Sequence, residues 1–191
     1  MQLRSIYRKI ACSQNDELTD DDILLDKLPL NLIHLPFVAR VFPKSKVLVA
    51  LRDPRDVCLS CYQQAFALNP AMANFLDLET TAKLYAEVMG FWLDSRNVLN
   101  NSWMEYRYED LVDDFDSVTH RIFDFLELDY PQNTSNYYKK ARRAMGTPSY
   151  HDASKPIYSR AKARWRNYKN HLEPIKDIIS PFIDAFQYPK D

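Results

Sequence analysis

Residues 46–60 read KVLVALRDPRDVCLS and contain the clearest succession of strand, turn and helix start in the chain. The run 46–51 is continuous and apolar, with β-branched side chains, as expected of a parallel strand that is covered on both faces. Asp53 is a good helix N-cap, and Pro54 suits the first helical position. We therefore predict a strand at 46–51 that leads directly into a helix at 54–67.

Outward from this stretch, helical and strand-like patterns alternate. The spacing of apolar residues predicts further helices at 3–12, 29–42, 78–99, 117–127, 134–144, 160–171 and 173–186. Apolar or alternating runs predict strands at 23–25 and 103–108, and polar segments predict loops at 14–22, 68–76 and 146–158. This order indicates an α/β fold with a small parallel sheet flanked by helices, in a single domain over residues 1–191.

The composition excludes several classes of partner. The net charge of −1 gives no general field for a nucleic acid or an anionic membrane, yet residues 155–169 carry basic side chains and no acid. This local excess of positive charge favours a small anionic ligand. No apolar run has the length of a membrane span, and the first residues lack an apolar signal core. We expect a cytoplasmic protein with no membrane and no nucleic-acid partner.

The three cysteines indicate neither a disulfide framework nor a metal site. Cys58 and Cys61 form one C-x-x-C motif without the second pair that zinc requires, so no metal is expected. A chain without a disulfide framework fits a reducing compartment. A thioredoxin-like motif also places C-x-x-C at a helix start, but here the motif lies around Ser60, and we interpret both cysteines as packing residues.

Arg52 and Ser60 have the spacing of an anion site. Arg52 leaves the carboxyl end of the predicted strand, where open α/β sheets bind ligands, and the helix that follows begins with free N–H groups. Ser60 lies two turns into that helix, so a guanidinium and a hydroxyl can grip one phosphate from two sides. On spacing alone, an ordinary surface arginine beside a helix cap explains the same residues.

Three ordered blocks carry a family resemblance. They are DKLPLNLIHLPFVARVFPKSKVLVALRDPRDVCLS at 26–60, YEDLV at 108–112 and TPSYHDASKPIYSRAKARWRNY at 147–168. Together they resemble the sulfotransferases that use 3′-phosphoadenosine 5′-phosphosulfate (PAPS). The closest likeness is to the tyrosylprotein sulfotransferase-like group, which includes bacterial members fused to tetratricopeptide repeats. The resemblance implies the P-loop nucleotide hydrolase-like sulfotransferase fold and allows upstream tetratricopeptide repeats in a full-length protein.

The resemblance implies which residues bind the nucleotide. Arg52 and Ser60 match the family positions that hold the 3′-phosphate of PAPS. Tyr108 matches the position of an aromatic side chain against the adenine. Arg164, in the basic segment, would close over the 3′-phosphate end, although a solvated helix face is the simpler explanation of that segment. Trp165 is interpreted as a packing residue.

Lys27 and Ser149 match the positions that act on the phosphosulfate. Lys27 would reach the bridging oxygen, where a cation stabilises charge that develops on the leaving phosphate. Ser149 would donate to the 5′-phosphate side. The sequence departs from the family at Asp152, usually an amide, and at Pro36, where glycine is common. A carboxylate at Asp152 would repel nearby phosphates.

Other parts of the family's site have no match in the sequence. The family's phosphate loop is glycine-rich, whereas the only glycines here are Gly90 and Gly146. The family also carries its catalytic glutamate upstream; Glu17 lies in an acidic loop and is not expected to be that base, nor is His34. We therefore expect an N-terminally truncated form of the fold that does not catalyse transfer alone.

Two functions stay open at this point. The first is transfer of a sulfonyl group from PAPS to a hydroxyl acceptor, a protein tyrosine or a carbohydrate, with the nucleotide and the acceptor as partners and without a metal. The second is a noncatalytic module that binds PAPS or the product nucleotide. A phosphotransferase is disfavoured, because the sequence has no G-x-x-x-x-G-K loop.

Overall fold

The computed structural model describes residues 2–12, 22–131 and 159–190. The chain divides into two compact units. The first comprises residues 1–47 and 88–102, and the second comprises residues 48–87 and 103–191. Helix α4 (Leu78–Ser95), predicted at 78–99, contributes its first part to the second unit and its last part to the first.

The first unit is helical. Besides the end of α4 it contains α1 (Gln2–Cys12), the 3-10 helix η1 (Pro29–His34) and α2 (Leu35–Val41), which confirms the helices predicted at 3–12 and 29–42. The Tyr7 hydroxyl donates to the Asp26 carboxylate at 2.6 Å, and the Tyr7 ring meets the Phe42 ring edge to face at 5.2 Å. The Asn101 side-chain amide donates to the carbonyls of Phe42 and Ser45, both at 2.9 Å, and so fixes the turn before the first strand.

The strand predicted at 23–25 is wrong. Ile23, Leu24 and Leu25 belong to no strand, and their side chains are 68%, 43% and 80% exposed. Three residues offer few ladder hydrogen bonds, and in the described part of the chain the sheet consists of two other strands. The Asp26 carboxylate, which also accepts from the Asn31 amide, instead ties this segment to the helices beside it.

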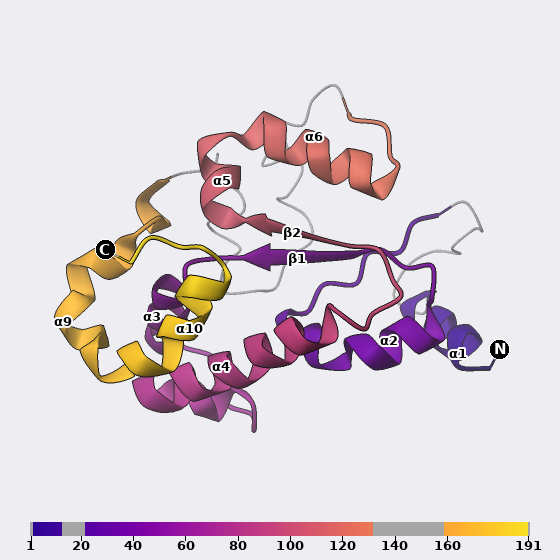
Figure 1. The fold of residues 1–191 in the computed structure, drawn as a ribbon. Coiled ribbons are helices and arrows are strands. Elements are labelled where there is room, and N and C mark those ends of the chain that lie inside the picture. The colour runs from indigo at the N-terminus through magenta and orange to yellow at the C-terminus, as the bar shows by residue number, and fades with distance from the viewer. Residues whose placement is uncertain (1, 13–21, 132–158, 191) are drawn as a thin grey trace. The chain divides into compact units, whose positions relative to one another are not determined.

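The second unit is built on a parallel pair of strands, β1 (Val47–Leu51) and β2 (Trp103–Arg107). Helices α5 (Tyr108–Asp113) and α6 (Phe115–Leu126) lie on one side of the pair, and α3 (Pro54–Gln63) and α10 (Lys176–Ala185) lie on the other (Figure 1). The predicted α/β fold with a small parallel sheet flanked by helices is confirmed. Both strands end on the same side, where α3 and α5 begin.

Some helix predictions need correction. Helix α3 ends at Gln63 rather than at residue 67, and nothing in the sequence after Gln63 marks this end. The expected loop at 68–76 contains a 3-10 helix, η2 (Met72–Leu76), and α5 was not predicted. The segments predicted at 134–144 and 146–158 lie outside the described residues, as does nearly all of 14–22.

The helix predicted at 160–171 is interrupted. The segment instead consists of short turns before α10: η5 (Ser159–Ala161), η6 (Arg164–Tyr168), α9 (Lys169–Leu172) and η7 (Glu173–Ile175). Ala163 adopts the left-handed conformation, with φ 53° and ψ 28°. Such a residue ends a right-handed helix and costs a non-glycine side chain about 1 kcal/mol or more. A tertiary contact must therefore stabilise this turn.

The core of the second unit joins the sheet to the carboxyl-terminal helices. The Tyr85 ring meets the Phe182 ring edge to face at 5.5 Å. The fully or nearly buried apolar side chains of this unit are Val49, Leu51, Cys58, Leu59, Ala82, Val118, Trp165, Leu172, Ile175, Ile179, Phe182, Ile183, Phe186 and Tyr188. Most of them come from β1, α3 and the segment after residue 164, so this segment is part of the fold's core.

Shortening one of these side chains tests the core. Ile179→Ala removes a side chain that is 1% exposed and is expected to lower the free energy of unfolding by about 2–5 kcal/mol. Leu68→Ala, at a side chain that is 71% exposed, is the control and should leave stability within about 0.5 kcal/mol. Urea unfolding measures both. Equal effects of the two variants would contradict a core at α10.

Candidate functional site at the start of α3

The turn between β1 and α3 has the predicted geometry. The Asp53 carboxylate accepts from the backbone N–H of Arg55 at 3.0 Å, which makes Asp53 the N-cap, and Pro54 is the first helical residue. Asp56 lies in the first turn. The strand therefore delivers Arg52 to the point where a capped helix begins, as the sequence indicates.

Arg55 is the centre of a buried network that the sequence did not reveal. Its Nε and Nη2 donate to the two oxygens of Asp53 at 2.9 and 2.7 Å, and its guanidinium lies 3.6 Å from the centre of the Trp165 ring. Nη1 and Nη2 also donate to the carbonyls of Lys190 and Pro189. This one side chain joins the turn to two distant parts of the chain.

Glu109 supports the same turn from α5. One carboxylate oxygen accepts from the backbone N–H of Asp53 and the other from the Tyr188 hydroxyl, both at 3.0 Å. Burial raises the pKa of Tyr188, and the neighbouring carboxylate raises it further, so this hydroxyl stays a donor. Arg107 donates to the Phe186 carbonyl and stacks on the Tyr188 ring at 4.9 Å. The carboxyl-terminal segment is thus bound to the ends of both strands.

Arg52 is only partly enclosed. Its Nη2 donates to the Ala161 carbonyl at 2.7 Å, and its guanidinium lies 5.1 Å from the centre of the Tyr108 ring. The side chain remains 24% exposed, so a dissolved anion has access to it. The structure therefore brings together two residues, Arg52 and Tyr108, that the sequence assigns to one nucleotide site.

The Asp56 side chain lies next to the Arg52 guanidinium and is fully buried. One oxygen, Oδ1, accepts from the backbone N–H of Trp165 at 2.8 Å, and the N–H of Ala163 also contributes. The other, Oδ2, lies 4.0 Å from Arg52 Nη2 and has no hydrogen-bond partner among the described residues. Burial raises the pKa of Asp56, although these N–H groups and the nearby guanidinium oppose the rise.

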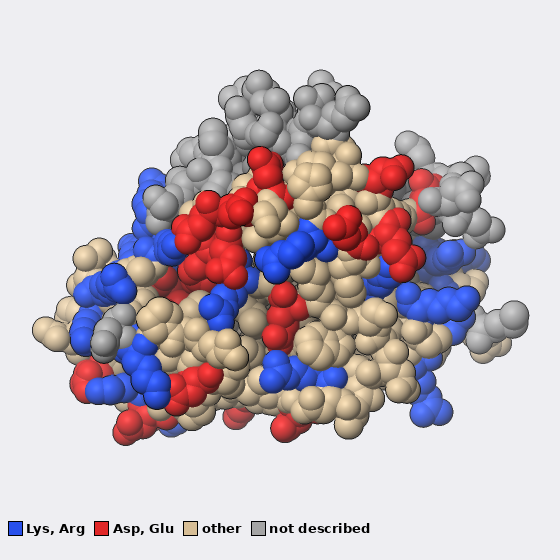
Figure 2. All heavy atoms as spheres, turned by 45° about the horizontal axis from the view of Figure 1, so that its top comes forward, with Lys and Arg blue, Asp and Glu red and all other residues tan. Residues whose placement is uncertain are grey.

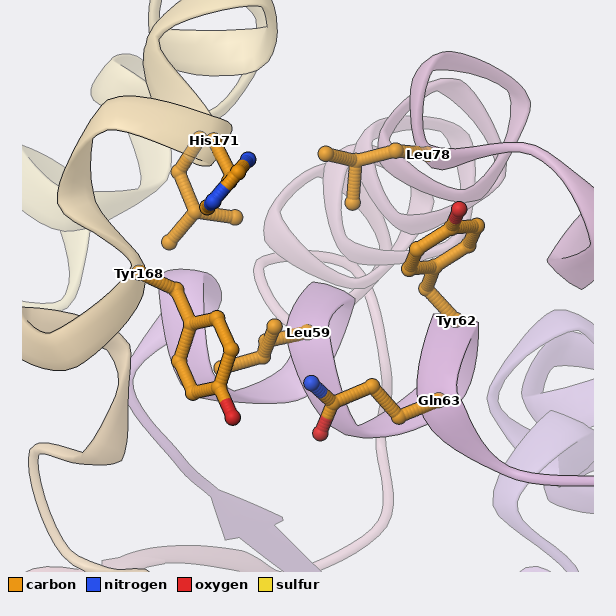
Figure 3. A pocket seen from close by; sticks show the side chains of 7 residues that line it. Leu59, Tyr62, Gln63, Leu78, Tyr168 and His171 are labelled. Carbon is orange, nitrogen blue, oxygen red and sulfur yellow. The ribbon is translucent and has the colours of Figure 1, made fainter.

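The exposed Ser60 side chain lies on α3, the helix that contacts the turn at 164–168. At the end of α3, a pocket of about 370 Å³ is lined by Leu59, Tyr62, Gln63, Leu78, Tyr168, His171 and Leu172 (Figure 3). Hydrogen bonds from the side chains of Arg164 and Gln63 to the Tyr168 hydroxyl lower the pKa of Tyr168. Arg164 is exposed and lies 5.8 Å from the centre of the Tyr168 ring. It is thereby held on the same side of the second unit as the end of α3.

Lys27 and Ser149, the residues predicted to act on the phosphosulfate, cannot be compared with this site. Lys27 belongs to the first unit, is exposed and follows no strand. Ser149 and Asp152 lie outside the described residues. The roles of Lys27 and Ser149 stay predictions.

The surface is mixed in charge. Basic and acidic side chains are interspersed over the face shown in Figure 2. In the part of the chain that the structure describes, no group of three or more histidine, cysteine or acidic side chains forms a metal site. No helix in the described ranges has the length and apolarity to cross a membrane.

Comparison with known proteins identifies the family of this chain. A family model described as "Sulfotransferase family" matches residues 3–132, which is more than half of the chain. The chain belongs to the sulfotransferase family. It is also 27% identical over 171 residues to an uncharacterized protein of Aquifex aeolicus (strain VF5), covering 87% of this chain but 22% of that relative. The chain therefore spans about a fifth of the relative's length.

The match to the sulfotransferase family includes most of the predicted site. Lys27, Arg52, Ser60 and Tyr108 fall within the matched residues, whereas Ser149 and Arg164 lie beyond them. Sequence reasoning missed Asp56 as a buried ligand of backbone N–H groups, because it reads as an ordinary acidic residue of a first helical turn. The alternation of basic and acidic side chains at Arg52, Asp53, Arg55 and Asp56 was the sequence signal that could have pointed to this role.

The interpretation of Cys58 and Cys61 as packing residues is supported. Cys58 is fully enclosed, Cys61 is half-buried, and both are free thiols. Burial raises the pKa of each thiol. A thioredoxin-like role requires the opposite shift, towards the thiolate.

Thiol labelling tests this interpretation. Iodoacetamide at about pH 8 is expected to leave Cys58 unmodified in the folded protein and to modify it in urea, because a buried thiol with a raised pKa is a poor nucleophile. Peptide mass mapping identifies the labelled residue. Rapid modification of Cys58 in the folded sulfotransferase chain would contradict the packing role.

The Arg55 network yields a stability prediction. Arg55→Leu leaves Asp53 buried without its cation and is expected to lower the free energy of unfolding by about 3–5 kcal/mol. Lys83→Leu removes the cation of an exposed pair with Glu79 on α4 and should cause no measurable change. Urea unfolding followed by circular dichroism compares the two. A loss for Arg55→Leu no greater than for the control would show that the network does not hold the fold.

Proposed function

We propose that this chain carries the nucleotide-binding part of a sulfotransferase that moves a sulfonyl group from PAPS to a hydroxyl acceptor. The observation that carries the proposal is the position of Arg52. This guanidinium stands at the carboxyl end of β1, directly before the start of α3, beside the Tyr108 ring and partly open to solvent. Ligands of open α/β sheets bind at such strand ends.

The chemistry of this site suits the 3′-phosphate of the nucleotide. Arginine has five N–H donors, and Arg52 uses one of them on the Ala161 carbonyl. Its Nε has no hydrogen-bond partner among the described residues. The exposed Ser60 hydroxyl on α3 supplies a neutral donor, and Arg164 supplies a second cation from η6. Charge-assisted hydrogen bonds of this kind favour a phosphate over a neutral group.

The reacting end of the nucleotide is assigned to Lys27 and Ser149. In the proposed reaction the acceptor hydroxyl loses its proton to a base and its oxygen bonds to sulfur. The bond from sulfur to the bridging phosphate oxygen breaks, and 3′,5′-adenosine bisphosphate leaves. A cation such as Lys27 would stabilise the charge left on the phosphate, and the Ser149 hydroxyl would donate to the 5′-phosphate side. The proposed acceptor is a hydroxyl of a protein tyrosine or of a carbohydrate. Upstream tetratricopeptide repeats are a proposed part of a longer protein.

A noncatalytic nucleotide-binding module is the second candidate. One observation favours it. The described second unit contains the proposed 3′-phosphate residues Arg52, Ser60 and Arg164, whereas Lys27 belongs to the other unit and Ser149 lies outside the described residues. Such a module would bind PAPS or 3′,5′-adenosine bisphosphate without turnover.

Titration with 3′,5′-adenosine bisphosphate tests the shared claim of both candidates. Arg52→Ala is expected to weaken binding about 10- to 100-fold, because it removes a charge-assisted contact worth about 1.5–3 kcal/mol. Arg96→Ala, at an arginine of the first unit, should bind as wild type does. Isothermal calorimetry measures the affinities. Equal affinity of wild type and Arg52→Ala would refute the nucleotide site.

A transfer assay then separates the two candidates. Labelled PAPS is incubated with the chain and with tyrosine peptides or carbohydrates. Label on the acceptor identifies an enzyme. Nucleotide binding that depends on Arg52, without label transfer, identifies a binding module.

A further inference from the structure

Asp56 connects the two cations that we assign to the 3′-phosphate. Its Oδ2 faces the Arg52 guanidinium, with 4.0 Å between Oδ2 and Nη2. Its Oδ1 accepts from the backbone N–H of Trp165 at 2.8 Å, and the N–H of Ala163 also contributes. Arg164 is the residue between these two N–H groups. One buried carboxylate therefore touches the surroundings of both Arg52 and Arg164.

The backbone around Arg164 is in a conformation that needs support. Ala163 has a positive φ of 53°, which is unfavourable for a residue with a Cβ atom. Hydrogen bonds from the flanking N–H groups to Asp56 offset this cost, and the neighbouring Arg52 guanidinium donates to the Ala161 carbonyl. The turn is thus bound by a carboxylate and a guanidinium that belong to the same strand–helix junction.

Burying the Asp56 carboxylate costs free energy, so its position calls for an explanation. A fully buried carboxylate normally has hydrogen bonds to both oxygens, yet Oδ2 has no such partner among the described residues. Arg52 Nε is likewise buried and unpartnered within the described part of the chain. Unsatisfied groups of this kind are concentrated at functional sites.

We propose that Asp56 is a positioning residue that holds Arg52 and the backbone of Arg164 in the arrangement that binds the 3′-phosphate. This inference rests on the proposed nucleotide function and goes beyond it, because it assigns a negative residue to an anion site. Asp56 acts through the two arginines and does not touch the phosphate. Docking of residues 161–165 onto the junction and binding of the anion by Arg52 are therefore linked.

A comparison of two nucleotides tests the role. Asp56→Asn keeps an oxygen for the Trp165 N–H but loses the charge that faces Arg52. It is expected to weaken 3′,5′-adenosine bisphosphate binding about tenfold, the effect of losing one charge-assisted contact. Binding of adenosine 5′-monophosphate, which lacks the 3′-phosphate, should not change. A purely structural effect would lower both affinities equally. Glu79→Gln, an exposed carboxylate on α4, is the matched control.

The possible outcomes separate this inference from the proposed function. If wild type does not prefer the bisphosphate over the monophosphate, the proposed function fails. If wild type has the preference and Asp56→Asn keeps or increases it, only the role of Asp56 is overturned. Tighter binding by Asp56→Asn would mean that the carboxylate merely repels the anion. In an Arg52→Ala background, Asp56→Asn should cause little further loss, since residues that act through each other are not additive.

Hydrogen exchange on the wild-type protein provides a test that does not depend on a variant folding. The bisphosphate is expected to slow amide exchange at Ala163 and Trp165, because anion binding and docking of this turn are linked. The monophosphate should slow it less. Equal protection by both nucleotides would overturn the proposal.

Discussion

The buried ion pair between Asp53 and Arg55 is the contact on which the junction between β1 and α3 depends. Asp53 caps the helix and accepts from Nε and Nη2 of Arg55. The same guanidinium donates to the carbonyls of Pro189 and Lys190 and stacks on Trp165. A buried pair of this type contributes little net stability relative to an apolar replacement. What it provides is a fixed geometry, since removing either partner leaves an uncompensated charge.

A fixed junction determines where the neighbouring side chains point. Arg52 leaves the strand one residue before the cap and is directed towards the Ala161 carbonyl and the Tyr108 ring. Asp56 follows the cap by three residues and reaches the backbone of Trp165. Two aspartates in one turn therefore have separate tasks: Asp53 closes the junction, and Asp56 connects it to the basic turn around Arg164. The carboxyl-terminal segment is part of the site, because Asp53 is joined to it through Arg55 and Asp56 accepts from the Trp165 N–H.

The parts of the structure that sequence alone predicts are those with local causes. The strand at 47–51 follows from continuous apolar residues, and the start of α3 follows from an N-cap and a proline. The position of Arg52 follows from both. Prediction failed where a distant partner decides: residues 160–171 have helical composition, but Asp56, 109 positions from Trp165, holds a left-handed residue in that segment. The apolar run 23–25 failed because hydrophobicity alone does not supply a neighbouring strand.

The roles assigned to the site residues stay predictions, and the structure shows only how some of these residues are arranged. The Arg52 guanidinium lies beside the Tyr108 ring, and Arg164 lies on a turn attached to the same junction. Lys27 and Ser149 are assigned by resemblance alone. The roles of Arg55, Asp56 and Glu109 were hidden, because each depends on partners more than fifty residues away.

A structure of the chain with bound 3′,5′-adenosine bisphosphate is the most direct measurement of the central claim. The account predicts 3′-phosphate oxygens within about 3.2 Å of the Arg52 guanidinium and of the Ser60 hydroxyl. It also predicts that Asp56 keeps its hydrogen bond to the Trp165 N–H in that complex. A nucleotide bound elsewhere on the protein, with no phosphate at Arg52, would contradict the account.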